Sequence, residues 1–181
     1  MTLEEFKYKV YALIEEYSDS ADEMTEDEDL ATKMNTVINQ VQNEMARFKK
    51  INGYAVLDVE KDEVKTLNEI DENLYQLNLI RGLEAEIIGD RIIFNEDGTA
   101  KIFYYKYPTQ INQDTDDSFE FELDPDVLEV MVYGVAADLL KSDVSSNYGK
   151  IYADRYREMK NELDPRKTMG MIYIEGSMGV W

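Results

Sequence analysis

The sequence lacks two residue types on which many functional sites depend. Cysteine and histidine are both absent from the 181 residues. Without cysteine no disulfide framework can form, which argues against a small secreted scaffold. The same absences exclude zinc and haem sites built on these side chains, a cysteine nucleophile and a histidine base. We therefore expect a protein that is not an enzyme and that needs no metal or cofactor.

Long apolar runs are missing as well. No stretch approaches the roughly 18 apolar residues that a membrane-spanning helix requires, so we expect no membrane contact. The first ten residues carry four charged side chains and lack the apolar segment of a signal peptide. Glycine spacings typical of phosphate-binding loops and of a nucleophile elbow are also absent. We therefore expect synthesis and folding in a cytoplasm.

Acidic residues, in contrast, are abundant. The chain holds 39 Asp and Glu against 19 Lys and Arg, a net charge of −20. Residues 1–30 carry a net −9 and residues 54–123 a net −11, whereas residues 31–53 carry +3. This charge excludes strong binding to free DNA. It favours solubility and mutual repulsion, or a surface past which DNA slides without binding. The acidic cluster at 22–29 lacks the ligand spacing of a calcium loop.

Two helices are predicted in the N-terminal part. Over residues 2–18 apolar side chains recur every three or four positions, and Thr2 with Glu5 has the spacing of a capping box. A second apolar stripe runs over residues 28–50 and ends in a basic turn followed by Asn52-Gly53. Such a sequence is typical of a helix C-terminus.

The period then changes to that of β-strands. Short apolar or alternating segments are separated by turn residues, and Gly89-Asp90 fits a type II′ hairpin with glycine first. We interpret residues 54–123 as an antiparallel β insertion. Strands are predicted at 54–59, 64–70, 74–80, 85–88, 91–95, 100–107 and 119–123.

Helical character returns after residue 123. Asp124-Pro125 is a typical helix start, and residues 127–140 are apolar nearly all round, which predicts a buried central helix. Gly134 within it indicates the close approach of another backbone. A fourth helix is predicted over 146–163 and ends before Pro165.

Tyrosines repeat every four residues along this fourth helix. Packing in the core explains such a stripe. A contact between subunits is the alternative, because tyrosine suits half-wet interfaces and the neighbouring basic side chains would meet the acidic N-terminal helix of another copy. The candidate subunit interface consists of Tyr148, Tyr152, Arg155, Tyr156 and Arg166.

The C-terminal segment 168–181 is unusual for a chain end because it carries many large apolar side chains. We predict an extended arm that docks either on its own chain or on a partner. The residues assigned to partner contact are Met169, Met171, Ile172, Tyr173, Ile174, Met178, Val180 and Trp181.

These patterns together predict a mainly α fold with a β insertion (α+β). The expected architecture is a four-helix, connector-like bundle formed by residues 1–53 and 124–167. An antiparallel β block at 54–123 interrupts this bundle, and the arm at 168–181 extends from it.

Several ordered motifs resemble those of phage head–tail adaptor proteins, the connector-completion or neck-ring family. The segment Leu128–Lys141 ends in Ala-Ala-Asp-Leu-Leu-Lys, and a tyrosine-rich helix follows at Asn147–Tyr156. Leu163-Asp-Pro-Arg166 closes that helix, and Lys101–Pro108 is similar to the strand that closes the β insertion in such proteins.

The resemblance implies a structural virion protein of the neck, made in the host cytoplasm. It implies a homo-oligomeric ring, commonly of twelve subunits, that lies beneath the portal protein and extends the DNA channel. It further implies contact between the C-terminal arm and the portal, a platform for tail or further neck proteins, and DNA that passes without sequence-specific binding.

Two other functions stay open from the sequence. An acidic inhibitor that mimics DNA would use the charge of −20 to block a DNA-binding protein. The segmental placement of the acids and the apolar arm argue against it. An immunity or regulatory binding module has no specific signal in the sequence.

Overall fold

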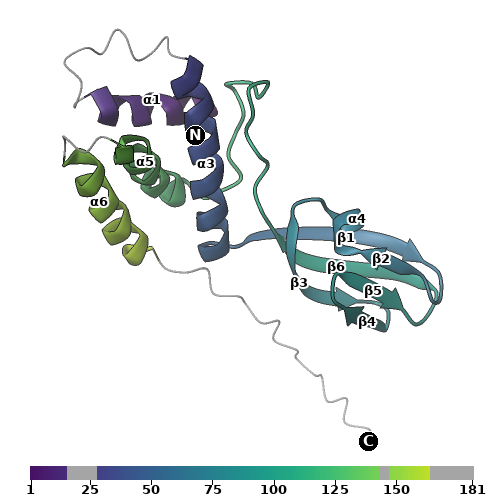
Figure 1. The fold of residues 1–181 in the computed structure, drawn as a ribbon. Helices are drawn as coiled ribbons and strands as arrows, with labels where there is room; N and C mark the ends of the chain where they lie inside the picture. The colour runs from purple at the N-terminus through teal and green to yellow at the C-terminus, as the bar shows by residue number, and fades with distance from the viewer. Residues whose placement is uncertain (16–27, 143–146, 164–181) are drawn as a thin grey trace, which may run out of the picture.

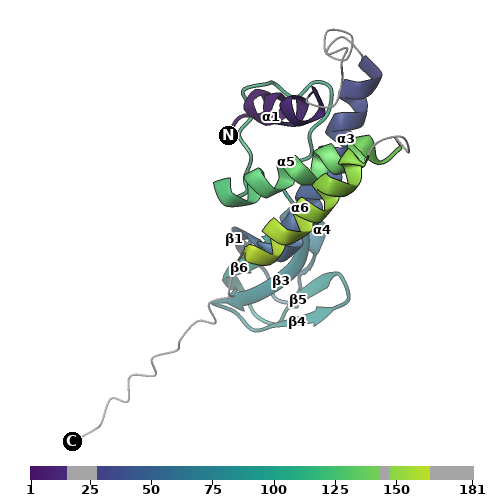
Figure 2. The same ribbon diagram turned by 90° about the vertical axis from the view of Figure 1, so that its left-hand side faces the viewer.

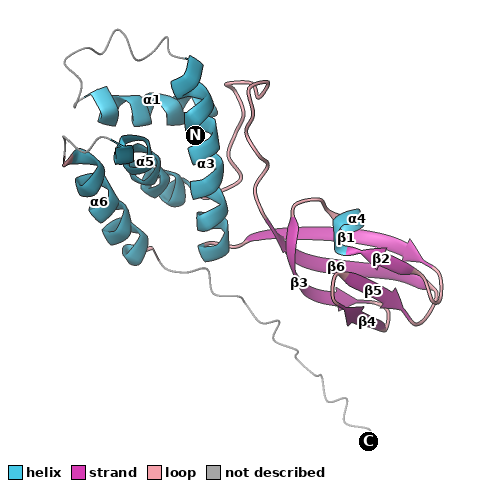
Figure 3. Cartoon of the chain, viewed as in Figure 1, coloured by secondary structure: helices cyan, strands magenta, loops and turns pink. Residues whose placement is uncertain are grey.

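A computed structural model describes residues 1–15, 28–142 and 147–163. These residues form five α-helices, one 3₁₀ turn and two three-stranded antiparallel sheets. Four of the helices gather at one end of the molecule, and the strands lie at the other end together with one short helix (Figures 1 and 3). The protein is therefore α+β, with helices and strands segregated in space.

Helix α5 is the centre of the helical part. It contacts α1, α3 and α6, each of which packs a different side of it (Figure 2). This position follows from its sequence, because α5 is apolar nearly all round and most of its residues are buried. The bounds are α1 Leu3–Glu15, α3 Glu28–Phe48, α5 Pro125–Leu139, the 3₁₀ turn η1 Leu140–Ser142, and α6 Tyr148–Glu162.

The prediction of a four-helix bundle is wrong. In a bundle the helices lie nearly parallel around a shared apolar seam. Here α1, α3 and α6 pack around the buried α5, and a fifth helix, α4, lies among the strands. The apolar stripes show that each helix buries one face, but stripes alone do not specify which helix faces which. The observed arrangement differs from the predicted bundle because the other helices enclose α5.

A long connection completes the helical core. It runs from Tyr107 back to α5, and its Ile111 and Leu123 are buried among the helices. Helix α3 holds this connection through polar side chains. Asn39 accepts a hydrogen bond from the Ile111 amide at 2.8 Å and donates to the Ile111 carbonyl at 2.7 Å. The buried Gln42 donates to the Thr109 carbonyl at 3.1 Å.

The strands form a small two-sheet sandwich. The first sheet has the order β1-β6-β3, the second has the order β2-β5-β4, and all pairs are antiparallel. Side chains from both sheets share one core that includes Ile92, Phe94, Ile102 and Tyr104. The bounds are β1 Ile51–Val59, β2 Val64–Thr66, β3 Leu74–Arg81, β4 Ala85–Ile88, β5 Arg91–Phe94 and β6 Gly98–Lys106.

Asn52-Gly53 does not end a helix, contrary to the prediction. Helix α3 stops at Phe48 and β1 already begins at Ile51. Gly53 lies opposite Tyr104 in the neighbouring strand. A Cβ atom at Gly53 would lie only 2.0 Å from Cε2 of Tyr104. The glycine is therefore required by a tyrosine ring that covers the strand, not by a left-handed turn.

Other local predictions have mixed outcomes. The capping box of Thr2 and Glu5 is confirmed, with hydrogen bonds of 3.0 and 3.2 Å. The hairpin at Gly89 is confirmed, and its φ of 64° fits the predicted turn. The strand predicted at 119–123 is wrong, because Phe119 and Phe121 pack on the helical core and only Glu120 forms an isolated bridge, to Thr2.

The short helix α4, Leu67–Ile70, was not predicted. Thr66 and Glu69 form a capping box that starts it between β2 and β3. The signal was present in the spacing of these two residues. The stretch also contains alternating apolar residues, which favoured a strand instead.

Replacing Gly134 tests the tight contact between α5 and α6. A Cβ atom at this position would lie 3.0 Å from the Tyr156 ring and 3.2 Å from Val41. We expect Gly134→Val to lower the free energy of unfolding by about 1–3 kcal/mol through overpacking. Urea denaturation measures the change. The control Ala12→Val, on the exposed face of α1, should cost much less, and an unchanged midpoint for Gly134→Val would contradict the packing.

The environment of the Tyr104 hydroxyl leads us to expect a loss of stability at alkaline pH. Burial, together with a 2.9 Å hydrogen bond to Asp71, raises the pKa of Tyr104 to about 12 from its ordinary value of 10.0. The folded state thus holds the phenol proton more tightly, and this stabilisation is complete below pH 10.0 and lost as the pH rises toward 12. Denaturation at several pH values measures the free energy of unfolding. With rising pH this free energy should fall less steeply for Tyr104→Phe than for wild type, whereas the variant Tyr54→Phe, at an exposed position, should follow wild type. Equal slopes for Tyr104→Phe and wild type would refute this.

Candidate interaction surface

Two of the predicted interface tyrosines point into the helical core. Tyr152 on α6 is buried, and its hydroxyl donates a 2.8 Å hydrogen bond to the carbonyl of Leu13 at the end of α1. Tyr156 lies one turn further on, and its ring covers Gly134. Within this chain, packing therefore accounts for Tyr152 and Tyr156, which was one of the two interpretations of the stripe.

The surroundings of Tyr156 keep its hydroxyl neutral. Burial, reinforced by the carboxylate of Glu44, raises the pKa of Tyr156 well above its ordinary value. Lys160 forms an ion pair with Glu44, and its Nζ lies 5.7 Å from the centre of the Tyr156 ring. The lysine thus links α6 to α3 through both a charge and a ring contact.

The strip of α6 that adjoins Tyr152 is exposed. Tyr148 and Ile151 are 41% and 54% exposed, and Arg155 follows them on the same side of the helix. Arg155 lies 3.4 Å from Glu158. We name Tyr148, Ile151 and Arg155 the α6 stripe. An exposed apolar stripe that ends in a cation is suited to contact with another protein surface.

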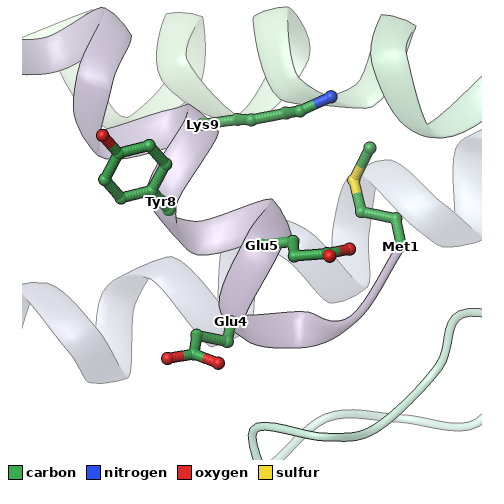
Figure 4. Close-up of a pocket in the computed structure, with 5 residues that line it drawn as sticks. All are labelled: Met1, Glu4, Glu5, Tyr8 and Lys9. Atoms are coloured by element: carbon green, nitrogen blue, oxygen red, sulfur yellow. The ribbon is translucent and has the colours of Figure 1, made fainter.

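A hollow of about 630 Å³ lies on the outer side of α1 (Figure 4). Glu5, which also caps the helix through Thr2, lies on its wall, and Tyr8 is 75% exposed. Two carboxylates beside apolar atoms suit an incoming aromatic or cationic side chain. The residues that line the hollow are Met1, Glu4, Glu5, Tyr8 and Lys9.

Sequence reasoning did not identify this hollow. Tyr8 lies off the apolar stripe of α1, which is the signal that could have marked it as a surface aromatic. Lys9 forms an ion pair with Glu129 of α5. This ion pair holds one wall of the hollow against the central helix α5.

The remaining predicted residues lie outside the described part of the chain. They are Arg166 of the candidate interface and the whole C-terminal arm. For the arm, residues 168–181, the prediction of partner contact stays a prediction. The described residues bring Tyr148 and Arg155 together on one surface, and they place Tyr152 and Tyr156 beneath it.

Neither a metal centre nor a membrane span is found among the described residues. No group of three or more carboxylates there is arranged to hold a metal ion. Likewise, no helix in those ranges has the length and apolar character to cross a bilayer. No protein-family model matches the chain, and no curated protein matches it.

A matched pair of substitutions compares a buried and an exposed tyrosine of α6. Tyr152→Phe leaves the Leu13 carbonyl without its buried donor, so we expect the free energy of unfolding to fall by about 1 kcal/mol. Tyr148→Phe, on the exposed stripe, should change it by less than about 0.5 kcal/mol. Thermal and urea unfolding measure both variants. Equal losses would contradict the stabilising role of the buried hydrogen bond from Tyr152 to Leu13.

Proposed function

We propose that the protein is a structural head–tail adaptor of a phage virion. In this role, copies of the chain form a ring beneath the portal, extend the DNA channel and present a platform to tail or further neck proteins. The protein acts through its surfaces and performs no catalysis.

The observation that supports this proposal best is the pair of helices α5 and α6. The segments Leu128–Lys141 and Asn147–Tyr156, which carry the resemblance to adaptor proteins, form adjoining helices in close contact. Most residues of helix α5 are buried in the core, whereas the α6 stripe stays exposed on α6. A motif that builds the core on one side and an exposed apolar stripe on the other is expected of a subunit that assembles.

The α1 hollow offers a binding surface for the α6 stripe of a second copy. The hollow contains Glu4 and Glu5, and the stripe ends in Arg155, so their charges are complementary. The two surfaces differ, and a contact between different surfaces of identical chains is heterologous. Such contacts generate closed rings when the rotation between neighbours closes.

The charge of the chain suits a DNA channel. A net charge of −20 repels the phosphate backbone. DNA that must move through a ring benefits from walls that do not bind it. The apolar arm, residues 168–181, would supply the contact with the portal.

Deletion of residues 169–181 tests the role of the arm. We expect the shortened chain to lose co-sedimentation with purified portal rings of the same virus, whereas the full chain co-sediments. Circular dichroism and urea unfolding serve as controls for folding, since all helices and strands of the described residues lie before residue 164.

Point variants refine the same test. Ile172→Asp and Ile174→Asp should weaken portal binding, because a charge on an apolar contact must be desolvated. Glu175→Gln is the matched control in the same segment. Undiminished binding by the deletion variant would contradict the role of the arm, and a full chain that neither binds portal nor forms rings would contradict the proposed function.

A further inference from the structure

In the described residues the sandwich has four edge strands, and three of them are poor templates for a further strand. The edges are β1 and β3 in the first sheet and β2 and β4 in the second. Strands β2 and β4 are only three and four residues long. Strand β3 is eight residues long, but its register with β6 shifts at two places. Short and irregular edges are the usual means by which proteins avoid unwanted strand pairing.

Strand β1 lacks this protection. Its nine residues pair with β6 in one unbroken register, from Ile51 opposite Lys106 to Val59 opposite Gly98. It contains no proline and one charged side chain, Asp58. Every second residue of an antiparallel edge strand directs its N–H and C=O away from the partner strand. Within the described ranges no backbone hydrogen bond from another segment reaches these groups of β1, and no other element lies alongside it.

The side chains of β1 are open as well. Ala55 and Leu57 pack on the sandwich core but are only half-buried, whereas Ile102 of the neighbouring β6 is fully buried. On the outer side, Tyr54 and Val56 are 53% and 51% exposed. A strand added beyond β1 would therefore cover apolar groups on both sides of the sheet and complete the hydrogen bonds of its edge.

The C-terminal segment starts near this edge. Lys160, in the last turn of α6, is ion-paired with Glu44 of α3, and its Nζ lies 5.8 Å from the ring centre of Phe48. Phe48 ends α3, and β1 begins three residues later at Ile51. Leu163 and Ile51 both pack on the helical core. The end of α6 thus lies near the start of β1 (Figures 1 and 2).

The segment after α6 has the length and composition of an added strand. Residues 164–181 follow the described part of the chain. When extended, these residues span up to about 59 Å, whereas the nine residues of β1 require about 30 Å. The stretch Met169–Glu175 contains no proline, one charged residue and the consecutive residues Ile172, Tyr173 and Ile174. Such a composition favours a strand.

We propose that, in the free chain, residues 169–175 of the arm add to the open edge of β1 as a fourth strand of the first sheet. The addition of an extended segment to an open sheet edge is a recurring mode of recognition. In the proposed function the portal takes the same segment, so β1 holds the arm until the portal binds. The inference rests on the proposed function only for this last step.

The chain's own arm suits this edge better than a strand from another molecule. Five residues, 164–168, separate Leu163 from Met169 and span up to about 20 Å. A tether of this length gives the arm an effective concentration in the millimolar range at its own edge. A strand from a second copy or from another protein would have to displace this tethered segment.

Paired cysteines test the proposal directly, because the chain has none of its own. Val56→Cys, on the exposed side of β1, is combined in turn with Met171→Cys, Ile172→Cys, Tyr173→Cys and Ile174→Cys. Neighbouring residues of a strand point to opposite sides of the sheet, and a disulfide requires Cα atoms within about 7 Å. We therefore expect disulfides within one chain at alternate arm positions, at least fivefold above the intervening positions, seen as faster bands in non-reducing electrophoresis.

Ile88→Cys is the matched control for Val56→Cys. Ile88 is 60% exposed, but it lies at the end of β4 in the second sheet. It should form no disulfide with any arm position. Equal yields from Val56→Cys and Ile88→Cys, equal yields at all four arm positions, or no disulfide at any of them would overturn the proposal. Covalent dimers in place of disulfides within one chain would overturn it too, and would assign the edge to the arm of a second copy.

Hydrogen exchange provides an independent measurement. In the full chain the β1 amides that point away from β6 should be protected by the arm. Deletion of residues 169–181 should speed their exchange at least tenfold. The amides of β6, which pair with β1 and β3 on either side, are the control and should not change. Unchanged exchange in β1 would overturn the proposal.

Portal rings separate this inference from the proposed function. When portal is added, the exchange of the outward β1 amides should rise toward that of the deletion variant. Portal binding by a chain whose cysteine pairs form no disulfide would contradict only the pairing of the arm with β1. Disulfides in a chain that never binds portal would support the pairing and contradict the head–tail role.

Discussion

The structure depends on the burial of one helix. Helix α5 is apolar on nearly every side, so every side must be covered by other parts of the chain. Each large apolar side chain that it buries contributes about 1.5–3 kcal/mol, so this helix contributes strongly to stability. Helices α1, α3 and α6 and the connection through Ile111 and Leu123 supply the cover. Their arrangement around α5 follows from this need, and the strands are left to form a separate core.

The same constraint decides which surfaces remain for partners. Tyr152 and Tyr156 are used to cover α5, whereas Tyr148, Ile151 and Arg155 of α6 stay exposed. At the other end of the molecule the two sheets bury their inner faces against each other and leave their outer faces exposed. The surfaces proposed for assembly are those that the two cores do not use.

Local signals in the sequence predicted local structure well. The capping box at Thr2, the start of α5 at Pro125 and the hairpin at Gly89 each depend on residues within a few positions of one another. The misassigned positions depend on distant partners. The need for glycine at position 53 comes from the Tyr104 ring, and the placement of Phe121 comes from packing on the helical core. Neither contact can be seen in a short window of sequence. For the same reason only part of the candidate interface could be predicted. The period of the tyrosines specifies one side of the helix, but it does not specify which of these residues a distant helix covers.

Electron microscopy of the purified chain, alone and with portal rings, tests the central claim most directly. The account predicts closed rings with a central hole wide enough for a DNA duplex, at least when the portal is present as a template. Chains that remain monomeric in light scattering and absent from portal particles in the images, under conditions where both proteins are folded, would contradict it.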